Sequence, residues 1–233
     1  MVYNSSESPM QTLSSPIKLI KDSVKIFFVK KNLIYFISIY LILVPFQIFQ
    51  YFQGAFADIS VKNIESDPYV WVTLIVTILY FLIYFLSSAA TILAVKKVIA
   101  SEPLNFKETI TFAWKNLWQY LTLSILVFLA VFGGLILLII PGLVFSVWFF
   151  SAKFVFFDKG LGIKASMAES HRLVKGRFWA VWWRLFVFGL FTALAGFTIS
   201  VIPYGIGGVI TTLFGALFVL PAYLLYKELL SNS

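Results

Sequence analysis

The chain has 233 residues, of which 61% are hydrophobic and only 12% are charged, and its formal net charge is +8. Soluble domains carry roughly 25% charged residues, so this composition excludes a soluble globular protein and predicts an integral membrane protein. In such a chain the excess of Lys and Arg indicates topology rather than a nucleic acid partner. The absence of cysteine excludes disulfides, thiolate metal sites and thiol nucleophiles.

The chain begins with a polar stretch, 1–12, which we expect to be disordered and cytoplasmic, ahead of a single polytopic membrane domain over 13–233. A basic amphipathic helix is predicted to start at Ser15, a good N-cap that precedes Pro16. Its apolar residues recur at helical spacing opposite lysines, which is typical of a helix lying on a membrane surface. The basic residues expected at the lipid headgroups are Lys18, Lys21, Lys25, Lys30 and Lys31.

Six apolar runs follow, and each is long enough to cross the bilayer, since about 20 apolar residues span its ~30 Å hydrocarbon layer. Pro45 predicts a kink inside the first run. Tight turns are predicted at Pro141 and Gly142 and again from Pro203 onward. The expected spans are about 33–52, 69–95, 118–140, 143–157 and 178–202, with a last one that ends near Lys227.

Two further amphipathic helices are predicted between spans, one beginning near Asn105 and the other near Gly162. In the latter, Ile163, Met167, Ser170 and Val174 share a face, which again favours a helix lying on the membrane surface. A surface helix followed by two spans therefore occurs three times, an arrangement that we interpret as a weak internal repeat. The fold class predicted is an all-α integral membrane protein with six transmembrane helices and three amphipathic cytoplasmic surface helices.

The basic residues predict the orientation of the chain. Of the 18 Lys and Arg, five precede the first span, four separate the second from the third, seven lie within 153–184 and one is Lys227. Only Lys62 falls in a loop on the opposite side. By the positive-inside rule, both termini and all three surface helices face the cytoplasm of a cell-membrane protein.

Within 137–179 an apolar run has Pro-Gly at its tip, an Asp lies near the end of the next helix, and a helix with Glu-Ser and a Lys-Gly precedes an aromatic run. The positions of this pattern are Pro141, Gly142, Asp158, Ala165, Glu169, Ser170, Lys175, Gly176 and Trp179. The pattern resembles the membrane domain of glycerophosphodiester phosphodiesterases and related prokaryotic integral membrane proteins. The resemblance implies fold and membrane location, but it does not imply the enzyme activity, because in those phosphodiesterases the chemistry lies in a separate soluble barrel domain.

A cluster of charged residues follows the fourth span. We interpret it as a clamp that fixes the third surface helix to neighbouring spans, and a pocket for a lipid headgroup or ligand is the alternative. The residues of this predicted cluster are Asp158, Glu169, Arg172, Lys175 and Arg177.

Two charges lie within predicted spans, Lys153 and Arg184. An ionisable group among lipid tails is costly and therefore raises the hypothesis of a transport site. Both residues are close to a cytoplasmic end, where a long side chain can reach the headgroups, so we interpret them as anchors.

No pattern of catalytic, cofactor-binding or metal-binding residues is found in the sequence, and its one histidine, His171, has no second ligand at metal-binding spacing. We therefore expect a non-enzymatic membrane component that scaffolds a protein partner or binds anionic lipid. The alternative is a small transporter or a lipid-handling protein, which the prolines within spans would suit.

Single cysteines introduced at Ser66, Lys107 and Ser231 test the topology. Because Lys62 alone marks the outer side, an impermeant thiol reagent applied to whole cells should label only the cysteine at Ser66. Labelling at Ser231 would require an odd number of spans.

Overall fold

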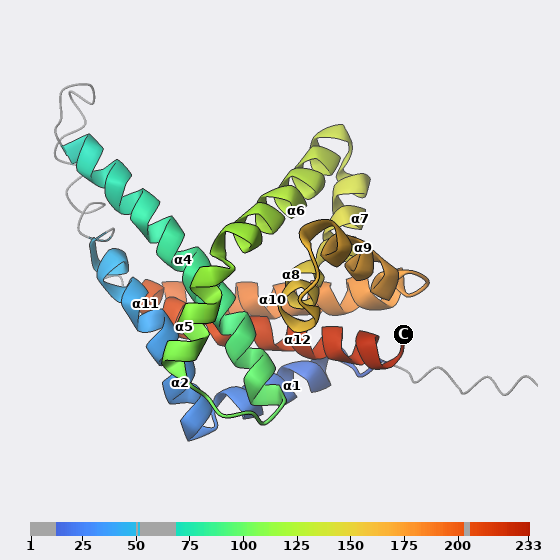
Figure 1. Ribbon diagram of the computed structural model, residues 1–233, viewed down its shortest axis with the longest axis horizontal. Helices are drawn as coiled ribbons and strands as arrows, with labels where there is room; N and C mark the ends of the chain where they lie inside the picture. The colour runs from blue at the N-terminus through green and yellow to red at the C-terminus, as the bar shows by residue number, and fades with distance from the viewer. Residues whose placement is uncertain (1–12, 50, 52–68, 203–205) are drawn as a thin grey trace, which may run out of the picture.

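The structure is a computed structural model that describes residues 13–49, 51, 69–202 and 206–233. Within these ranges every regular element is a helix, and no strand is present (Figure 1). The elements are α1 (Pro16–Phe27), α2 (Lys30–Tyr40), η1 (Leu41–Leu43), α4 (Tyr69–Ile99), α5 (Phe106–Lys115), α6 (Leu117–Leu137), α7 (Ile139–Phe149), α8 (Ala152–Lys159), α9 (Ile163–Val174), α10 (Phe178–Ser200), α11 (Ile206–Leu213) and α12 (Gly215–Ser231).

Among the described residues, six helical segments are long and apolar enough to cross a membrane, which confirms the predicted number and is consistent with a multi-pass membrane protein. Each has at least the roughly 20 residues that the hydrocarbon layer requires. The six segments are Lys30–Phe49, Trp71–Ile99, Leu117–Leu137, Ile139–Lys159, Phe178–Ile199 and Ile206–Ser231.

The first of these segments changes its helical geometry just before Pro45. Proline has no N–H to donate to the carbonyl of Leu41, four residues earlier. The Val44 N–H bonds to that carbonyl instead, which gives the tighter 3-10 turn of η1. The predicted kink at Pro45 is thus seen as a short 3-10 interruption, and the helix resumes through Phe49.

The turn between α6 and α7 differs from the prediction, which placed it at Pro141 and Gly142. The chain breaks instead at Leu138, whose backbone is extended (φ −164°, ψ 149°). Pro141 lies within the first turn of α7, where its missing N–H costs no helical hydrogen bond. Gly142 has a packing role: a Cβ on it would lie 2.4 Å from Leu135 Cγ and 2.8 Å from the Leu135 backbone nitrogen.

The buried core is concentrated in one part of the molecule. It is formed chiefly by α1, α2, the second half of α4, α8 and α12, and its fully buried side chains include Phe27, Phe36, Ile92, Phe154 and Tyr223. The first half of α4 and the α6–α7 hairpin extend away from this core in different directions (Figure 1). Leu137, at the hairpin tip, is 77% exposed, which suits contact with lipid.

The three helices predicted to lie on the membrane surface are present as α1, α5 and α9. Ser15 caps α1 by accepting a hydrogen bond from the Lys18 N–H at 3.3 Å, as predicted. Asn105 caps α5 in the same way, through the Glu108 N–H at 3.2 Å. The Lys97 ammonium, 2.8 Å from Glu108, then joins α5 to the end of α4.

The predicted apolar face of α9 is turned in large part toward the protein. Ser170 and Val174 are buried, and α9 contacts α7, α8 and α12. The Ser170 hydroxyl donates to the Trp148 carbonyl at 2.7 Å, and the Ser151 hydroxyl lies 2.8 Å from Ser170 Oγ. Because these hydroxyls bond to one another and to the backbone, α9 buries them without leaving them unsatisfied.

Several predicted features lie outside the described residues. These are the disordered terminus 1–12, the polar loop with Lys62 and Ser66, and the start of the last turn at Pro203.

Gly142→Ala should destabilise the α6–α7 hairpin, because the added Cβ overlaps Leu135 and its backbone. Overpacking of this kind costs about 1–3 kcal/mol, so the thermal unfolding temperature in detergent should fall. Gly133→Ala is the matched control: it lies in the same hairpin, and a Cβ there meets nothing within 4 Å. An equal unfolding temperature for the two variants would contradict this packing role.

Candidate functional site

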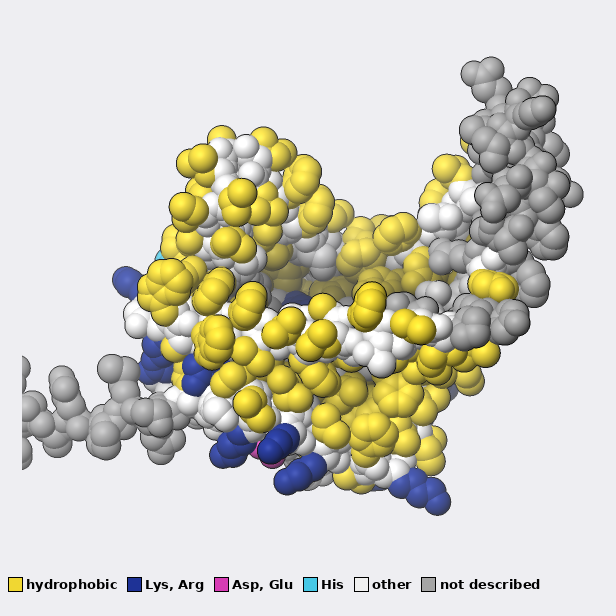
Figure 2. Space-filling model, turned by 180° about the vertical axis from the view of Figure 1, so that it is seen from behind, with side chains coloured by type: hydrophobic (Ala, Val, Ile, Leu, Met, Phe, Trp, Pro, Cys, Tyr) yellow, Lys and Arg dark blue, Asp and Glu magenta, His cyan; other side chains and the backbone are white. Residues whose placement is uncertain are grey.

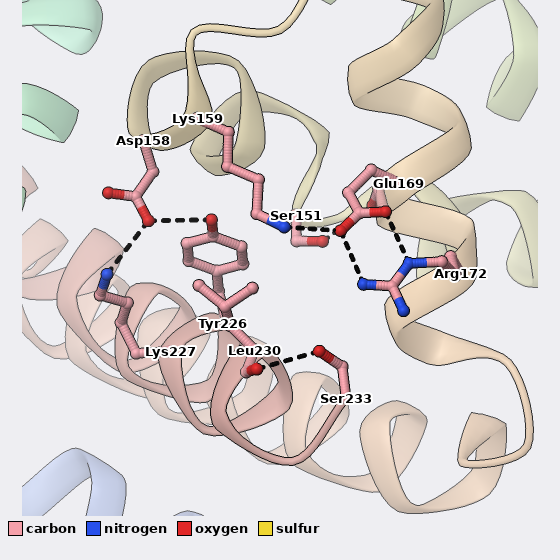
Figure 3. A network of polar contacts seen from close by, with 10 residues as sticks. Ser151, Asp158, Lys159, Glu169, Arg172, Tyr226, Lys227, Leu230 and Ser233 are labelled. Atoms are coloured by element: carbon pink, nitrogen blue, oxygen red, sulfur yellow. Dashed lines mark hydrogen bonds and ion pairs between the residues drawn. The ribbon is translucent and has the colours of Figure 1, made fainter.

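The end of α8 is the place where most of the charged contacts converge. The Asp158 side chain is 10% exposed, and the Lys227 ammonium and the Tyr226 hydroxyl both donate to its Oδ2 at 3.0 Å (Figure 3). Lys96, at the end of α4, lies 3.3 Å from Oδ1. One carboxylate therefore links three helices, α4, α8 and α12.

Lys96 also bonds to the backbone at the end of α8. Its ammonium donates to the carbonyls of Phe157 and Asp158, at 3.3 and 3.0 Å. The last carbonyls of a helix have no partner within the helix and carry partial negative charge, so a lysine is favourable there. Gly160 then ends α8 in the left-handed conformation, at φ +63°, and turns the chain toward α9.

A second charged cluster centres on Glu169 in α9. Arg172 donates to both carboxylate oxygens, from Nε at 2.6 Å and from Nη2 at 2.8 Å, and Lys159 donates to Oε1 at 2.7 Å (Figure 3). These charge-assisted bonds, first those from Arg172 and then that from Lys159, lower the pKa of Glu169 to about 2. The same contact raises the pKa of Arg172.

The predicted cluster of five residues is therefore two clusters, built on successive residues of α8. Asp158 faces α12, whereas Lys159 faces α9 (Figure 3). Of the other predicted members, Lys175 is exposed, and Arg177 donates from Nη2 to the Asn232 carbonyl at 2.5 Å.

The partners of Asp158 were not predicted from the sequence. Lys96 and Lys227 lie at the ends of predicted spans, and Tyr226 carries no sequence signal that separates it from other tyrosines near a membrane interface. Their places at the ends of two predicted spans, on the side predicted to be cytoplasmic, were the one feature that could have suggested a meeting with Asp158.

Arg184, one of the two charges within spans, holds the segment that leads into α1. Its guanidinium donates to the carbonyls of Leu13 at 2.6 Å, Ser14 at 2.8 Å and Ala180 at 2.7 Å. The Ser14 N–H in turn donates to Glu228 of α12 at 3.0 Å. Arg184 is therefore satisfied by backbone within the protein, a role that the prediction of an anchor at the headgroups did not include.

Lys153, the other charge within a span, lies near an aromatic ring. Its ammonium is 5.1 Å from the centre of the Phe154 ring, a cation–π distance, and no carboxylate pairs with it in the described ranges. Its assignment as an anchor stays a prediction.

The lysines predicted to contact headgroups lie on α1 and at the start of α2, and all five are exposed. Two of them, Lys18 and Lys25, line a groove between α1 and α12, whereas Lys21 is not part of its lining.

No group of three or more His, Asp and Glu side chains that could hold a metal ion is found among the described residues. The His171 ring packs against Trp148, with 4.4 Å between ring centres. The polar side chains gathered at α8 and α9 are paired with one another, an arrangement suited to fixing helices in place.

Comparisons of the chain with protein-family models, curated proteins and solved structures find no match. The resemblance of 133–183 to the phosphodiesterase membrane domain stays a prediction.

Asp158→Asn should lower the unfolding temperature in detergent, because it leaves the ammonium groups of Lys96 and Lys227 without their carboxylate. The cost should exceed the ~1 kcal/mol of an exposed pair and stay below the ~3–5 kcal/mol of a fully buried one, since the lysines are 28% and 39% exposed. Glu102→Gln, an exposed carboxylate, is the control. Unchanged stability together with loss of a bound ligand would favour the pocket interpretation over the clamp.

Acid should weaken the Glu169 cluster. Because the folded-state pKa of Glu169, about 2, lies below its ordinary 4.5, ionised Glu169 stabilises the fold above about pH 4.5, and this stabilisation is lost as the pH falls toward 2. Glu169→Gln should therefore unfold at a lower temperature than the parent chain at pH 7, and the difference should shrink between pH 4.5 and 2. A difference that stays constant over this range would contradict the assignment.

Proposed function

We propose that this chain is a non-enzymatic, multi-pass protein of the cell membrane whose cytoplasmic end binds anionic lipid and serves as a scaffold for a protein partner. The observation that carries the proposal is the sidedness of its charge: 17 of the 18 Lys and Arg fall on the side assigned to the cytoplasm.

The distribution of side chains on the molecular surface supports an anionic lipid partner. Lys and Arg side chains lie chiefly along one edge of the molecule, whereas the projecting α6–α7 hairpin is covered by hydrophobic side chains (Figure 2). Each basic residue near an anionic membrane surface contributes about 1 kcal/mol of attraction. The five exposed lysines of α1 and α2 together therefore suffice for a marked preference for anionic lipid.

The charged clusters support a scaffold rather than a catalyst. Asp158 and Glu169 each accept hydrogen bonds from cationic partners, and a carboxylate held in this way is a poor general base. The same bonds tie α4, α8, α9 and α12 into one unit at the end of the molecule assigned to the cytoplasm, which would present a fixed surface to a partner.

A lipid-handling role is the second candidate, and one observation favours it. The surface is hollowed beside the α6–α7 hairpin, and the hairpin side and the floor of this hollow carry mainly hydrophobic side chains (Figure 2). Such a surface suits acyl chains better than polar solutes.

The lipids that co-purify with the full-length protein in mild detergent test the proposal. Anionic lipids should be enriched over their share of the membrane, and high salt should reduce this enrichment because exposed charges are screened. Replacing Lys18, Lys21, Lys25, Lys30 and Lys31 by Gln should remove most of it, whereas replacing all five by Arg should preserve it. Enrichment that persists in the Gln variant would refute the proposed role of these lysines.

A further inference from the structure

A groove of about 570 Å³ opens between α1 and the last turns of α12. Its volume is in the range of small-molecule sites, roughly 300–1,000 Å³. It forms because the chain before α1 is fixed at two points: Arg184 holds the carbonyls of Leu13 and Ser14, and Glu228 holds the Ser14 N–H. These bonds therefore fix the position of α1, which forms one wall of the groove, relative to α10 and α12.

The charges on the α1 wall alternate in sign. Lys18, Asp22 and Lys25 are spaced i, i+4 and i+7, which places them on one face of the helix, and all three line the groove. Among the described residues, no ion pair or side-chain hydrogen bond involves either ammonium or the Asp22 carboxylate. This wall thus offers two cations and one anion to a ligand.

The α12 wall adds one charge of each sign, Lys227 and Glu228. The Lys227 ammonium also donates a hydrogen bond to Asp158, and one oxygen of Glu228 accepts a hydrogen bond from the Ser14 N–H. The groove therefore combines cations with carboxylates, and a purely anionic ligand would meet repulsion from Asp22 and Glu228.

The level of the groove along the span, together with its lining, indicates an amphipathic ligand. The groove lies at the end of the span Ile206–Ser231, the level at which a transmembrane helix meets the headgroups. Apolar side chains of Leu19, Ile26 and Leu224 line it beside the charges. Ile17, next to Lys18, is 61% exposed and adds apolar surface to α1.

We propose that this groove binds the headgroup of one phospholipid that carries both a phosphate and a primary ammonium. The phosphate pairs with Lys18 and Lys25, the ammonium donates hydrogen bonds to Asp22 and Glu228, and the glycerol portion lies over the apolar lining. A choline headgroup has the same net charge, but it has no N–H to donate to the carboxylates, so the groove discriminates against it. This site goes beyond the anionic-lipid preference proposed above and requires only that the chain lie in a membrane.

Native mass spectrometry of the full-length protein tests the site. The probes are phosphatidylethanolamine and phosphatidylcholine with identical acyl chains, supplied in equal amounts without anionic lipid, so the outcome does not depend on the anionic-lipid proposal. One ethanolamine lipid should be retained over the choline lipid by about tenfold or more, the effect expected for hydrogen bonds to charged groups. Equal retention would overturn the proposal, and this comparison uses the unmodified chain, so it needs no variant to fold.

Variants and soluble headgroups then locate the site. Asp22→Asn should abolish the preference, and Lys18→Gln and Lys25→Gln should weaken retention of both lipids. Lys115→Gln is the control, because this exposed lysine of α5 lies outside the groove, and it should behave as the parent chain does. O-phosphoethanolamine should displace the lipid, and equal displacement by inorganic phosphate would mean a simple phosphate site and overturn the headgroup assignment. A preference that survives in Asp22→Asn would overturn the placement in this groove.

Discussion

The carboxylate of Asp158 is the constraint on which the arrangement of the spans depends. Between helices surrounded by lipid there is no hydrophobic driving force for association, so specific packing and polar contacts must decide how they meet. Asp158 supplies such a contact for α4, α8 and α12 through Lys96, Lys227 and Tyr226. The most buried part of the molecule, around Phe154 and Tyr223, lies on the same three helices.

This constraint also explains the open shape of the molecule. The charged contacts tie the helices together at one end, and beyond that end α4 and the α6–α7 hairpin diverge (Figure 1). The hairpin is held together by its own close packing at Gly134 and Gly142. Its outer surface is apolar, so the bilayer can solvate it without a protein partner. The proposed lipid contacts follow from this division, with headgroups at the charged end and acyl chains along the hairpin.

The segment that leads into α1 is also held in place by polar contacts. Arg184 donates to two of its carbonyls, and Glu228 accepts one of its N–H groups, so α1 is held against α12 rather than resting only on lipid. The buried face of α1 contains Leu19 and Phe27, whereas Ile17 and Phe28 stay exposed. A helix with one buried and one exposed apolar face suits contact with both the protein and a membrane surface, and the groove lies beside it.

The sequence by itself determined that the chain is helical, with six segments long and apolar enough to cross a membrane, and where the short helices α1, α5 and α9 lie, because these features depend on composition and on spacing within single segments. It also located the cap at Ser15, which acts over three residues. Only the tertiary structure decided which charges meet, because Asp158 is paired with residues 62 and 69 positions away. Likewise, the groove exists only because Arg184 and Glu228, far apart along the chain, hold the same short segment before α1. Periodicity reports the face on which a side chain lies, whereas its partner depends on how the helices pack.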